Sequence, residues 1–319
     1  MSERPAEAVL WDFLRGAHMT KALAVAAELG LADALGAGLR RVDDLAAAAG
    51  VDPDALQRLL RALASDGVFE EREPGVFANT PASERLRSDG WPEFARLFGG
   101  VFYRAVEDLD RAVRTGSATF PAAFGSDFWP WLAAHAEERE AFDAAMAGGK
   151  SASAGRLGEL EWRDGETVVD VGGGNGALLV ALLARRPGLR GIVFDLPETE
   201  RDESTFGDEL EFIAGSFFER VPSGDAYLLS AILHDWDDEH AGSILRTTRD
   251  SAHADSRLLI LESVIPPGNE PNGAKWLDLL MLILAGGRER TEPEWRALLT
   301  GSGWTPASIE DGLIQAHPG

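Results

Sequence analysis

The sequence predicts an α/β protein, a doubly wound Rossmann-like domain preceded by a mainly helical domain with a winged-helix pattern. After about residue 150, short apolar runs alternate with helical segments. A glycine-rich turn at 172–176 follows the first of these runs, as in nucleotide-binding folds. Before residue 150, apolar positions recur mainly at helical spacing.

The amino-acid composition excludes several classes of protein and of site. The 319 residues include 53 acidic and 30 basic side chains, a formal net charge of −23, which argues against a broad nucleic-acid or anionic-membrane surface. No cysteine is present, so disulfides, thiolate zinc sites and thiol nucleophiles are excluded. The first residues lack a signal-peptide pattern, and the longest apolar stretch, 276–287, is too short to span a bilayer. We therefore expect a cytoplasmic protein.

The first hundred residues predict a winged-helix module. Helical spacing over 9–35 is interrupted at Gly30, and helices are predicted over 43–49 and 53–65. Strands at 68–71 and 76–78, joined by a Pro-Gly turn, form the wing. DNA binding is disfavoured because the recognition helix and the wing are acidic, with Asp52, Asp54, Asp66, Glu70, Glu71 and Glu73. We expect residues 1–100 to serve packing or dimerisation.

Residues 101–150 are predicted to form a helical linker. The stretch 91–146 is dense in aromatic side chains, most of which we assign to a helical core or a subunit interface. A few are expected to line an apolar pocket for a planar ligand. The linker is therefore expected to contribute to a substrate pocket.

Residues 151–319 are predicted to form the α/β domain. Its five strands are expected at 166–171, 190–194, 211–214, 226–233 and 257–263. Helical segments between them indicate a parallel sheet with crossover helices on both faces. The ligand of such a sheet binds at the carboxyl ends of the strands.

The turn after the first strand is a candidate cofactor site. Gly172, Gly174 and Gly176 allow close approach of the backbone, and free N–H groups at the helix start favour an anionic group. Asp195, at the end of the second strand, is placed to accept hydrogen bonds from a ribose diol. The spacing also satisfies the dinucleotide pattern, so the glycines indicate a class of site and not one cofactor. Neither tyrosine has a lysine four residues later, which removes one large class of dehydrogenases.

His234 is predicted to end the fourth strand, at the ligand-binding edge of the sheet. An imidazole there is a candidate base. The acidic run that follows, Asp237, Asp238 and Glu239, fits an N-cap and first helical turn better than a metal site. We therefore expect no metal.

Five runs stand in a fixed order along the chain: Asp-Val-Gly-Gly-Gly-Asn-Gly at 170–176, Phe-Asp-Leu-Pro at 194–197, Gly-Ser-Phe-Phe at 215–218, Leu-His-Asp-Trp-Asp-Asp-Glu at 233–239 and Gly-Gly-Arg-Glu-Arg-Thr at 286–291. Together they resemble a known family, the plant-type small-molecule O-methyltransferases (the caffeate and acetylserotonin type) with their bacterial natural-product relatives. The resemblance covers nearly the whole chain. It implies S-adenosylmethionine as cofactor and a homodimer formed through the N-terminal domain.

The resemblance also implies site residues. His234 would be the general base, oriented by Glu262 and Glu289. Cofactor contacts would come from Asp170, Gly172, Gly174, Asp195, Leu196, Ser216, Phe217 and Ser230. Acceptor contacts would come from Phe142, Met146, Asp235, Asp278 and Met281.

The implied chemistry is transfer of a methyl group to a phenolic hydroxyl of an aromatic natural product, without a metal. A phenol with a pKa near ~10 is mostly protonated at neutral pH, and an imidazole can take its proton. Two departures from the family pattern are Ser216, where an aspartate is usual, and Ser230, where plant members often carry a lysine. Some relatives use the same scaffold for hydroxylation or decarboxylation, which stays as an alternative. A ligand-responsive winged-helix regulator is a further one.

Overall fold

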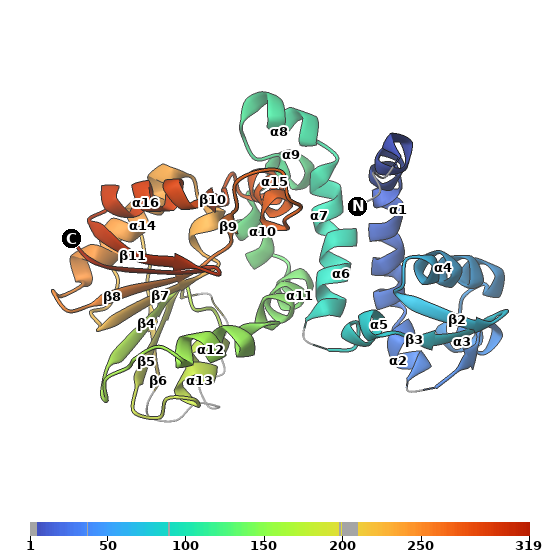
Figure 1. The fold of residues 1–319 in the computed structure, drawn as a ribbon, viewed down its shortest axis with the longest axis horizontal. Helices are drawn as coiled ribbons and strands as arrows, with labels where there is room; N and C mark the ends of the chain where they lie inside the picture. The colour runs from blue at the N-terminus through green and yellow to red at the C-terminus, as the bar shows by residue number, and fades with distance from the viewer. Residues whose placement is uncertain (1–4, 37, 89, 198, 200–209) are drawn as a thin grey trace. The chain divides into compact units, whose positions relative to one another are not determined.

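The structure is a computed structural model that describes residues 5–36, 38–88, 90–197, 199 and 210–319. The chain divides into two compact units, each described here by itself (Figure 1). Residues 1–104 and 136–148 form the N-terminal unit, and residues 105–135 and 149–319 form the C-terminal unit. The segment 101–150, predicted as one linker, is thus shared between the two units.

The N-terminal unit contains the expected winged-helix pattern. The long helix α1 (Ala6–Glu28) is separated from α2 (Leu31–Leu35) by Gly30, whose φ of 59° ends the helical run as predicted. Two helices, α3 (Val42–Ala49) and α4 (Pro53–Ser65), precede the hairpin of β2 (Phe69–Glu73) and β3 (Val76–Asn79). A two-residue strand, β1 (Arg40–Arg41), adds to β3 and gives the sheet order β1-β3-β2.

Local chemistry explains these boundaries. The Asp52 side chain accepts a hydrogen bond from the Ala55 amide, and Pro53 occupies the first turn, so α4 begins where the sequence predicts. Leu56, Leu60 and Leu63 share one face of α4 and are buried in the core of the unit. Further short helices complete the unit, namely α5 (Pro81–Arg85), α6 (Trp91–Gly99) and α11 (Ala136–Ala147), and α6 packs against both α1 and α11. The short helix α7 (Val101–Val106) spans the boundary between the units.

The C-terminal unit is built on a seven-stranded sheet in the order β11-β12-β8-β7-β4-β5-β6. The five predicted strands are present and parallel: β4 (Thr167–Val171), β5 (Arg190–Asp195), β6 (Leu210–Ala214), β7 (Ala226–Ser230) and β8 (Arg257–Leu261). The chain reverses direction across the sheet between β4 and β7, which confirms the doubly wound class.

Helices cover both faces of this sheet, as Figure 1 shows. On one face, α14 (Asp238–Ser251) and α16 (Glu292–Gly301) bury Ile244, Leu245 and Trp295 against the strands. On the other face, α12 (Lys150–Gly158) and α13 (Ala177–Leu183) bury Leu157 and Leu179. Two apolar cores therefore fix the sheet and leave its carboxyl edge for other contacts.

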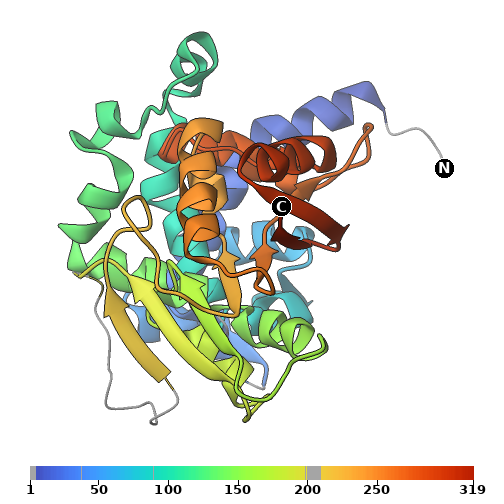
Figure 2. The same ribbon diagram turned by 90° about the vertical axis from the view of Figure 1, so that its left-hand side faces the viewer.

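The sheet differs from the prediction at one edge and at the ends of two strands, and one of these is β8, which ends at Leu261 and not at 263. Strands β11 (Trp304–Glu310) and β12 (Leu313–Pro318) form an antiparallel hairpin that pairs with β8, and this hairpin was not predicted. The hairpin, red in Figure 2, forms one edge of the seven-stranded sheet, and β6 forms the other. Strand β7 ends at Ser230, so the predicted extension to 233 is wrong. Ala231 adopts a φ of 55°, a conformation that a strand does not continue.

Further elements complete the C-terminal unit. They are α8 (Leu109–Thr115), α9 (Phe120–Phe124), α10 (Phe128–Ala133), α15 (Ala274–Leu284), the 3-10 helix η2 (Leu233–Asp235), and the paired short strands β9 (Val264–Ile265) and β10 (Arg290–Thr291). The Thr119 amide donates to the Ile283 carbonyl and ties the 105–135 segment to α15. Over the described residues, none of the helices has the length and apolar character needed to cross a membrane.

Candidate functional site

The glycine-rich turn lies at the carboxyl end of β4, as predicted. Gly172, Gly174 and Gly176 have φ values of 75°, 57° and 79°, which side-chain-bearing residues rarely adopt. A Cβ on Gly172 would lie 2.5 Å from Ile232 Cδ1. The backbone of this turn therefore favours glycine and forms a glycine cradle at residues 172–176.

Two carboxylates flank the turn. Asp195, at the end of β5, accepts hydrogen bonds from the amides of Gly174 (2.7 Å) and Leu196 (2.7 Å) and from the Thr199 hydroxyl (2.7 Å). Asp170, in β4, is 2% exposed, and its Oδ2 has no hydrogen-bond partner. Burial raises the pKa of Asp170 to about 7, although Lys150 opposes that shift. A buried acceptor without a partner, beside a glycine cradle, fits a polar ligand.

The other predicted cofactor residues lie on the same edge of the sheet. Ser216 and Phe217 follow β6, and Ser230 is the last residue of β7. The centre of the Phe217 ring lies 5.0 Å from that of the Phe218 ring in an edge-to-face contact. A Cβ on Gly172 would lie 3.7 Å from Phe217 Cε1, so Phe217 is close to the glycine turn. Leu196 is 44% exposed just after Asp195. These residues fit an adenosine-bearing cofactor with a carboxylate for its ribose.

His234 lies in η2, four residues beyond the end of β7, and not at the end of the strand as predicted. Its Nδ1 is 2.7 Å from Glu289 Oε1 and 3.4 Å from Glu262 Oε2. Both glutamates are buried, at 5% exposed for Glu262 and 1% for Glu289. The structure thus brings together the three residues predicted to be catalytic.

Three carboxylates set the protonation of this histidine. Burial by itself lowers the pKa of His234, but Glu262, Asp235 and Glu289 outweigh burial and raise the pKa to about 10. Burial raises the pKa of Glu262, and it raises that of Asp235 to about 7. Asp235 Oδ1 is 3.7 Å from His234 Nε2. Because Nδ1 is held by Glu289, Nε2 is the nitrogen that can exchange a proton with a substrate.

The backbone that carries His234 is held on both sides. Glu262 Oε1 accepts from the amides of Ile232 (2.9 Å) and Leu233 (2.8 Å). The Glu262 amide itself donates to the carbonyl of Gly312, in the turn of the β11–β12 hairpin, at 3.0 Å. Glu262 therefore positions the loop as well as facing the imidazole.

Arg290 holds the same loop from the other side, and the sequence analysis did not single it out. Its fully buried guanidinium donates to the carbonyls of Leu233 (3.0 Å) and Trp236 (2.9 Å) and to Asp238 (2.9 Å). The Arg288 amide donates to the His234 carbonyl at 2.8 Å. The place of Arg290 beside Glu289 in the Gly-Gly-Arg-Glu-Arg-Thr run was the available signal.

The residues predicted to bind an acceptor fall into two groups. Met281 is 7% exposed on α15, and Asp278 on the same helix accepts from the Glu289 amide at 2.9 Å, so it positions that glutamate. Asp235 adjoins the imidazole, as described above. Phe142 and Met146 lie on α11 of the N-terminal unit. Their contact with an acceptor stays a prediction.

The acidic run after His234 has the predicted helical role. Asp237 is the N-cap of α14 and accepts from the His240 amide at 2.9 Å, while Asp238 and Glu239 lie in its first turn. Within the described residues, the group with metal-ligand spacing is His234, Glu262 and Glu289, whose ligand atoms lie within 4.8 Å of one another. Glu262 Oε1 is already engaged by two backbone amides, and the Nδ1–Glu289 contact has hydrogen-bond length.

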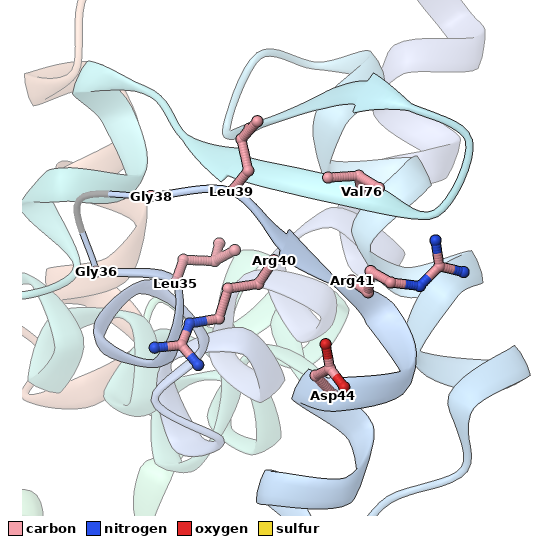
Figure 3. A pocket seen from close by; sticks show the side chains of 8 residues that line it. All are labelled: Leu35, Gly36, Gly38, Leu39, Arg40, Arg41, Asp44 and Val76. Atoms are coloured by element: carbon pink, nitrogen blue, oxygen red, sulfur yellow. The ribbon is translucent and has the colours of Figure 1, made fainter.

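A hollow of about 490 Å³ in the N-terminal unit has a different character. Its lining includes Leu35, Leu39, Val76 and Asp44, with Arg40 and Arg41 pointing away from each other (Figure 3). Arg41 is paired with the exposed Asp43. The described lining residues include no histidine, so we look for the chemistry at the sheet edge of the C-terminal unit.

Comparisons with known proteins identify the family of the two parts of the chain. Models described as an O-methyltransferase domain and an O-methyltransferase dimerisation domain match residues 106–305 and 11–89. The chain is 38% identical to phenazine O-methyltransferase PhzM of Lysobacter antibioticus, over 98% of this chain and 97% of that protein. It is 36% identical to 3-amino-4-hydroxybenzoate 4-O-methyltransferase of Streptomyces cremeus, over 97% and 88%. The O-methyltransferase NcsB1 of neocarzinostatin biosynthesis, solved with S-adenosylmethionine and 2-hydroxy-5-methyl naphthoic acid, aligns with a TM-score of 0.79 at 30% identity, over 94% and 96%.

Proposed function

Since the chain belongs to the S-adenosylmethionine-dependent O-methyltransferase family, we propose that it methylates a phenolic hydroxyl of an aromatic natural product, with His234 as general base and without a metal. The observation that carries this proposal is the contact of His234 Nδ1 with Glu289. It leaves Nε2 for the acceptor, beside the carboxyl ends of β4 and β7.

The residues of the chain divide the work. When bound, S-adenosylmethionine supplies a methyl group on a sulfonium ion that a nucleophilic oxygen can displace. The glycine turn and Asp195 would hold its methionine and ribose parts. His234 Nε2 receives the proton of the acceptor hydroxyl, and Glu289 keeps the other ring proton on Nδ1.

The raised pKa of His234 suits a phenol. Proton transfer from a phenol with a pKa near ~10 to a histidine with a pKa of about 10 is close to balanced in free energy. An aliphatic alcohol, with a far higher pKa, would give up its proton much less readily to the same base. The site therefore favours a phenolic acceptor.

The aromatic character of the acceptor is supported by the relatives. Phenazine and hydroxybenzoate appear in the names of two relatives, and a naphthoic acid lies in the solved NcsB1 structure. These are properties of those proteins. For this chain they support a planar aromatic acceptor, for which Met281 and Asp235 are candidate contacts.

The test is an assay of the purified enzyme with S-adenosylmethionine and a panel of phenazine, benzoate and naphthoate phenols, analysed by mass spectrometry. We expect products that are heavier by one CH2. A gain of oxygen or a loss of carbon dioxide would instead support the hydroxylase or decarboxylase alternatives. Activity should survive dialysis against a chelator, and loss that divalent ions restore would contradict the metal-free mechanism.

We further propose that the chain forms a homodimer through its N-terminal unit. Helix α1 exposes large apolar side chains, with Leu10, Trp11, Phe13 and Leu14 each more than 60% exposed. A row of this kind on a domain that matches a dimerisation family indicates a subunit contact. Leu14→Asp should shift the mass in light scattering from dimer to monomer. Val113→Asp, at an equally exposed apolar residue of the C-terminal unit, is the matched control and should remain dimeric.

A further inference from the structure

Lys150, the first residue of α12, places its ammonium at the carboxyl edge of the sheet. Its Nζ lies 3.5 Å from the hydroxyl of Ser230, at the end of β7. In the parts of the chain that the structure describes, Lys150 forms no ion pair within 4.0 Å. The side chain is nevertheless partly buried. A partly buried ammonium with one long polar contact is poorly compensated.

The surroundings of Lys150 are acidic but do not pair with it directly. Burial lowers the pKa of Lys150, and the nearby charges of Asp170 and Glu262 offset part of that shift. Asp170 Oδ2 and Glu262 Oε2 are both buried without a hydrogen-bond partner. A cation and two acceptors thus lie near one another with free bonding capacity, next to the glycine turn.

The cofactor carries the complementary groups. The methionine part of S-adenosylmethionine has an α-carboxylate, an α-ammonium and a sulfonium. The carboxylates of Asp170, Asp195 and Glu262 attract the two cations but repel the α-carboxylate. The two arginines of the 286–291 run are already paired, Arg288 with Asp238 and Glu294, and Arg290 with Asp238.

We propose that Lys150, with the Ser230 hydroxyl beside it, binds the α-carboxylate of the methionine part of S-adenosylmethionine. This inference rests on the cofactor of the proposed function. It also explains the departure at Ser230, since an ammonium that plant members carry on the β7 strand reaches this edge from α12 instead. Lys150 is a cofactor-binding residue and takes no part in proton transfer.

The test combines one substitution in the protein with the removal of one group, the α-carboxylate, from the ligand. Calorimetry measures the affinity of the wild type and of Lys150→Met for S-adenosylmethionine and for its decarboxylated analogue. We expect Lys150→Met to bind S-adenosylmethionine about tenfold or more weakly, as for a lost charge-assisted hydrogen bond. Its affinity for the decarboxylated analogue should be unchanged or slightly better.

Two controls sharpen this test. Lys275→Met removes an ammonium that is exposed and bound to the carbonyls of Gly268 and Glu270, and it should affect neither ligand. Asp195→Ala should weaken both ligands to the same extent, because the ribose is common to them.

Several results would overturn the assignment. Equal weakening of both ligands by Lys150→Met would show a structural role, and no weakening would show that the carboxylate binds elsewhere. If Lys150→Met fails to fold, the affinities of Lys150→Gln and of the wild type for the two ligands test the proposal instead. Wild-type discrimination between the two ligands of less than threefold would contradict the proposal. These readouts need no acceptor, so they stand apart from the test of phenol methylation.

Discussion

Two buried glutamates at opposite edges of one sheet show how differently a carboxylate can be satisfied. Glu166, just before β4, and Glu262, just after β8, are each 5% exposed. Both oxygens of Glu166 are bonded, by the Arg163 Nε (2.8 Å), the Arg163 amide (3.0 Å) and Arg257 (2.9 Å). Glu262 bonds two amides through Oε1 only, while Oε2 faces His234 at 3.4 Å without a hydrogen bond.

The two glutamates differ in the residue that serves as their counterion. Arginine stays charged at every accessible pH, so Glu166 has a permanent counterion. The counterion of Glu262 is a histidine, which can gain or lose its proton. The amino edge of the sheet therefore carries an ion pair whose charges are fixed. The carboxyl edge carries groups that can exchange protons.

The largest effect on kcat is expected when the imidazole of His234, which can gain or lose a proton, is removed. His234→Gln keeps a polar side chain of similar size but no base, and kcat should fall by about 10²–10⁴-fold. Steady-state assays measure kcat, and calorimetry with S-adenosylhomocysteine should show unchanged affinity. A variant with full activity would remove His234 from the role of base.

The pH profile should report the raised pKa of His234. Only the neutral imidazole accepts a proton, so kcat/KM should rise about tenfold per pH unit from neutral pH and level off near the pKa of about 10. Glu289→Gln removes one charge that raises this pKa, so its plateau should begin at lower pH, with kcat about 10²-fold lower from misplacement of the ring. Any rise of kcat/KM with pH that remains in His234→Gln is assigned to ionisation of the phenol itself. An unshifted plateau in Glu289→Gln would contradict the coupling.

The same titration affects stability. The folded pKa of His234 lies above its ordinary value of 6.5, so the protonated histidine stabilises the fold below about pH 6.5. This contribution is lost as pH rises towards 10. Chemical denaturation of the wild type should show the loss, and His234→Gln should not.

Glu166→Gln tests the fixed pair at the other edge and is the counterpart of Glu289→Gln. It weakens the bonds to Arg163 and Arg257, and the free energy of unfolding should fall by about 1–3 kcal/mol. Measured below its melting transition, kcat should stay within about twofold of the wild type with an unchanged pH profile. A shifted profile would show that the two edges are coupled.

The smallest expected effect concerns the strained residue between β7 and the histidine. Ala231 has a φ of 55°, which costs about 1 kcal/mol for a residue with a Cβ. Ala231→Gly removes that cost but adds flexibility to the unfolded chain, so the free energy of unfolding should rise by less than about 1 kcal/mol. Urea denaturation measures this change. A loss of more than about 1 kcal/mol would mean that the alanine methyl group packs favourably.

The sequence predicts the parallel strands and the wing because each combines an apolar run with a clear turn or cap. The end of β7 was missed because the run Leu228-Leu-Ser-Ala-Ile-Leu233 stays mostly apolar beyond the last paired residue. Pairing with β8 ends at Ser230, and Ala231 then turns the chain. Tertiary contacts, and not local propensity, decided that boundary.

The β11–β12 hairpin did carry a signal. Asp311 and Gly312 both have positive φ, at 49° and 76°, and Asp-Gly is a strong indicator of a two-residue hairpin turn. Lys150 carried none, since it meets Ser230 across 80 residues of sequence. Of the site, the sequence could identify the residues within runs, but not the partners that only the fold brings to the same edge.

The contact between Gly312 and Glu262 has a consequence for the order of events during synthesis. The Glu262 amide bonds the Gly312 carbonyl, and a Cβ on Gly312 would lie 2.9 Å from the Glu262 carbonyl oxygen. Strands β4 to β8 emerge from the ribosome well before residue 312 does. A nascent chain can therefore fold its parallel sheet while the loop with His234 still lacks one of its anchors. We expect this anchor of the His234 loop to form only when β12 pairs with β8.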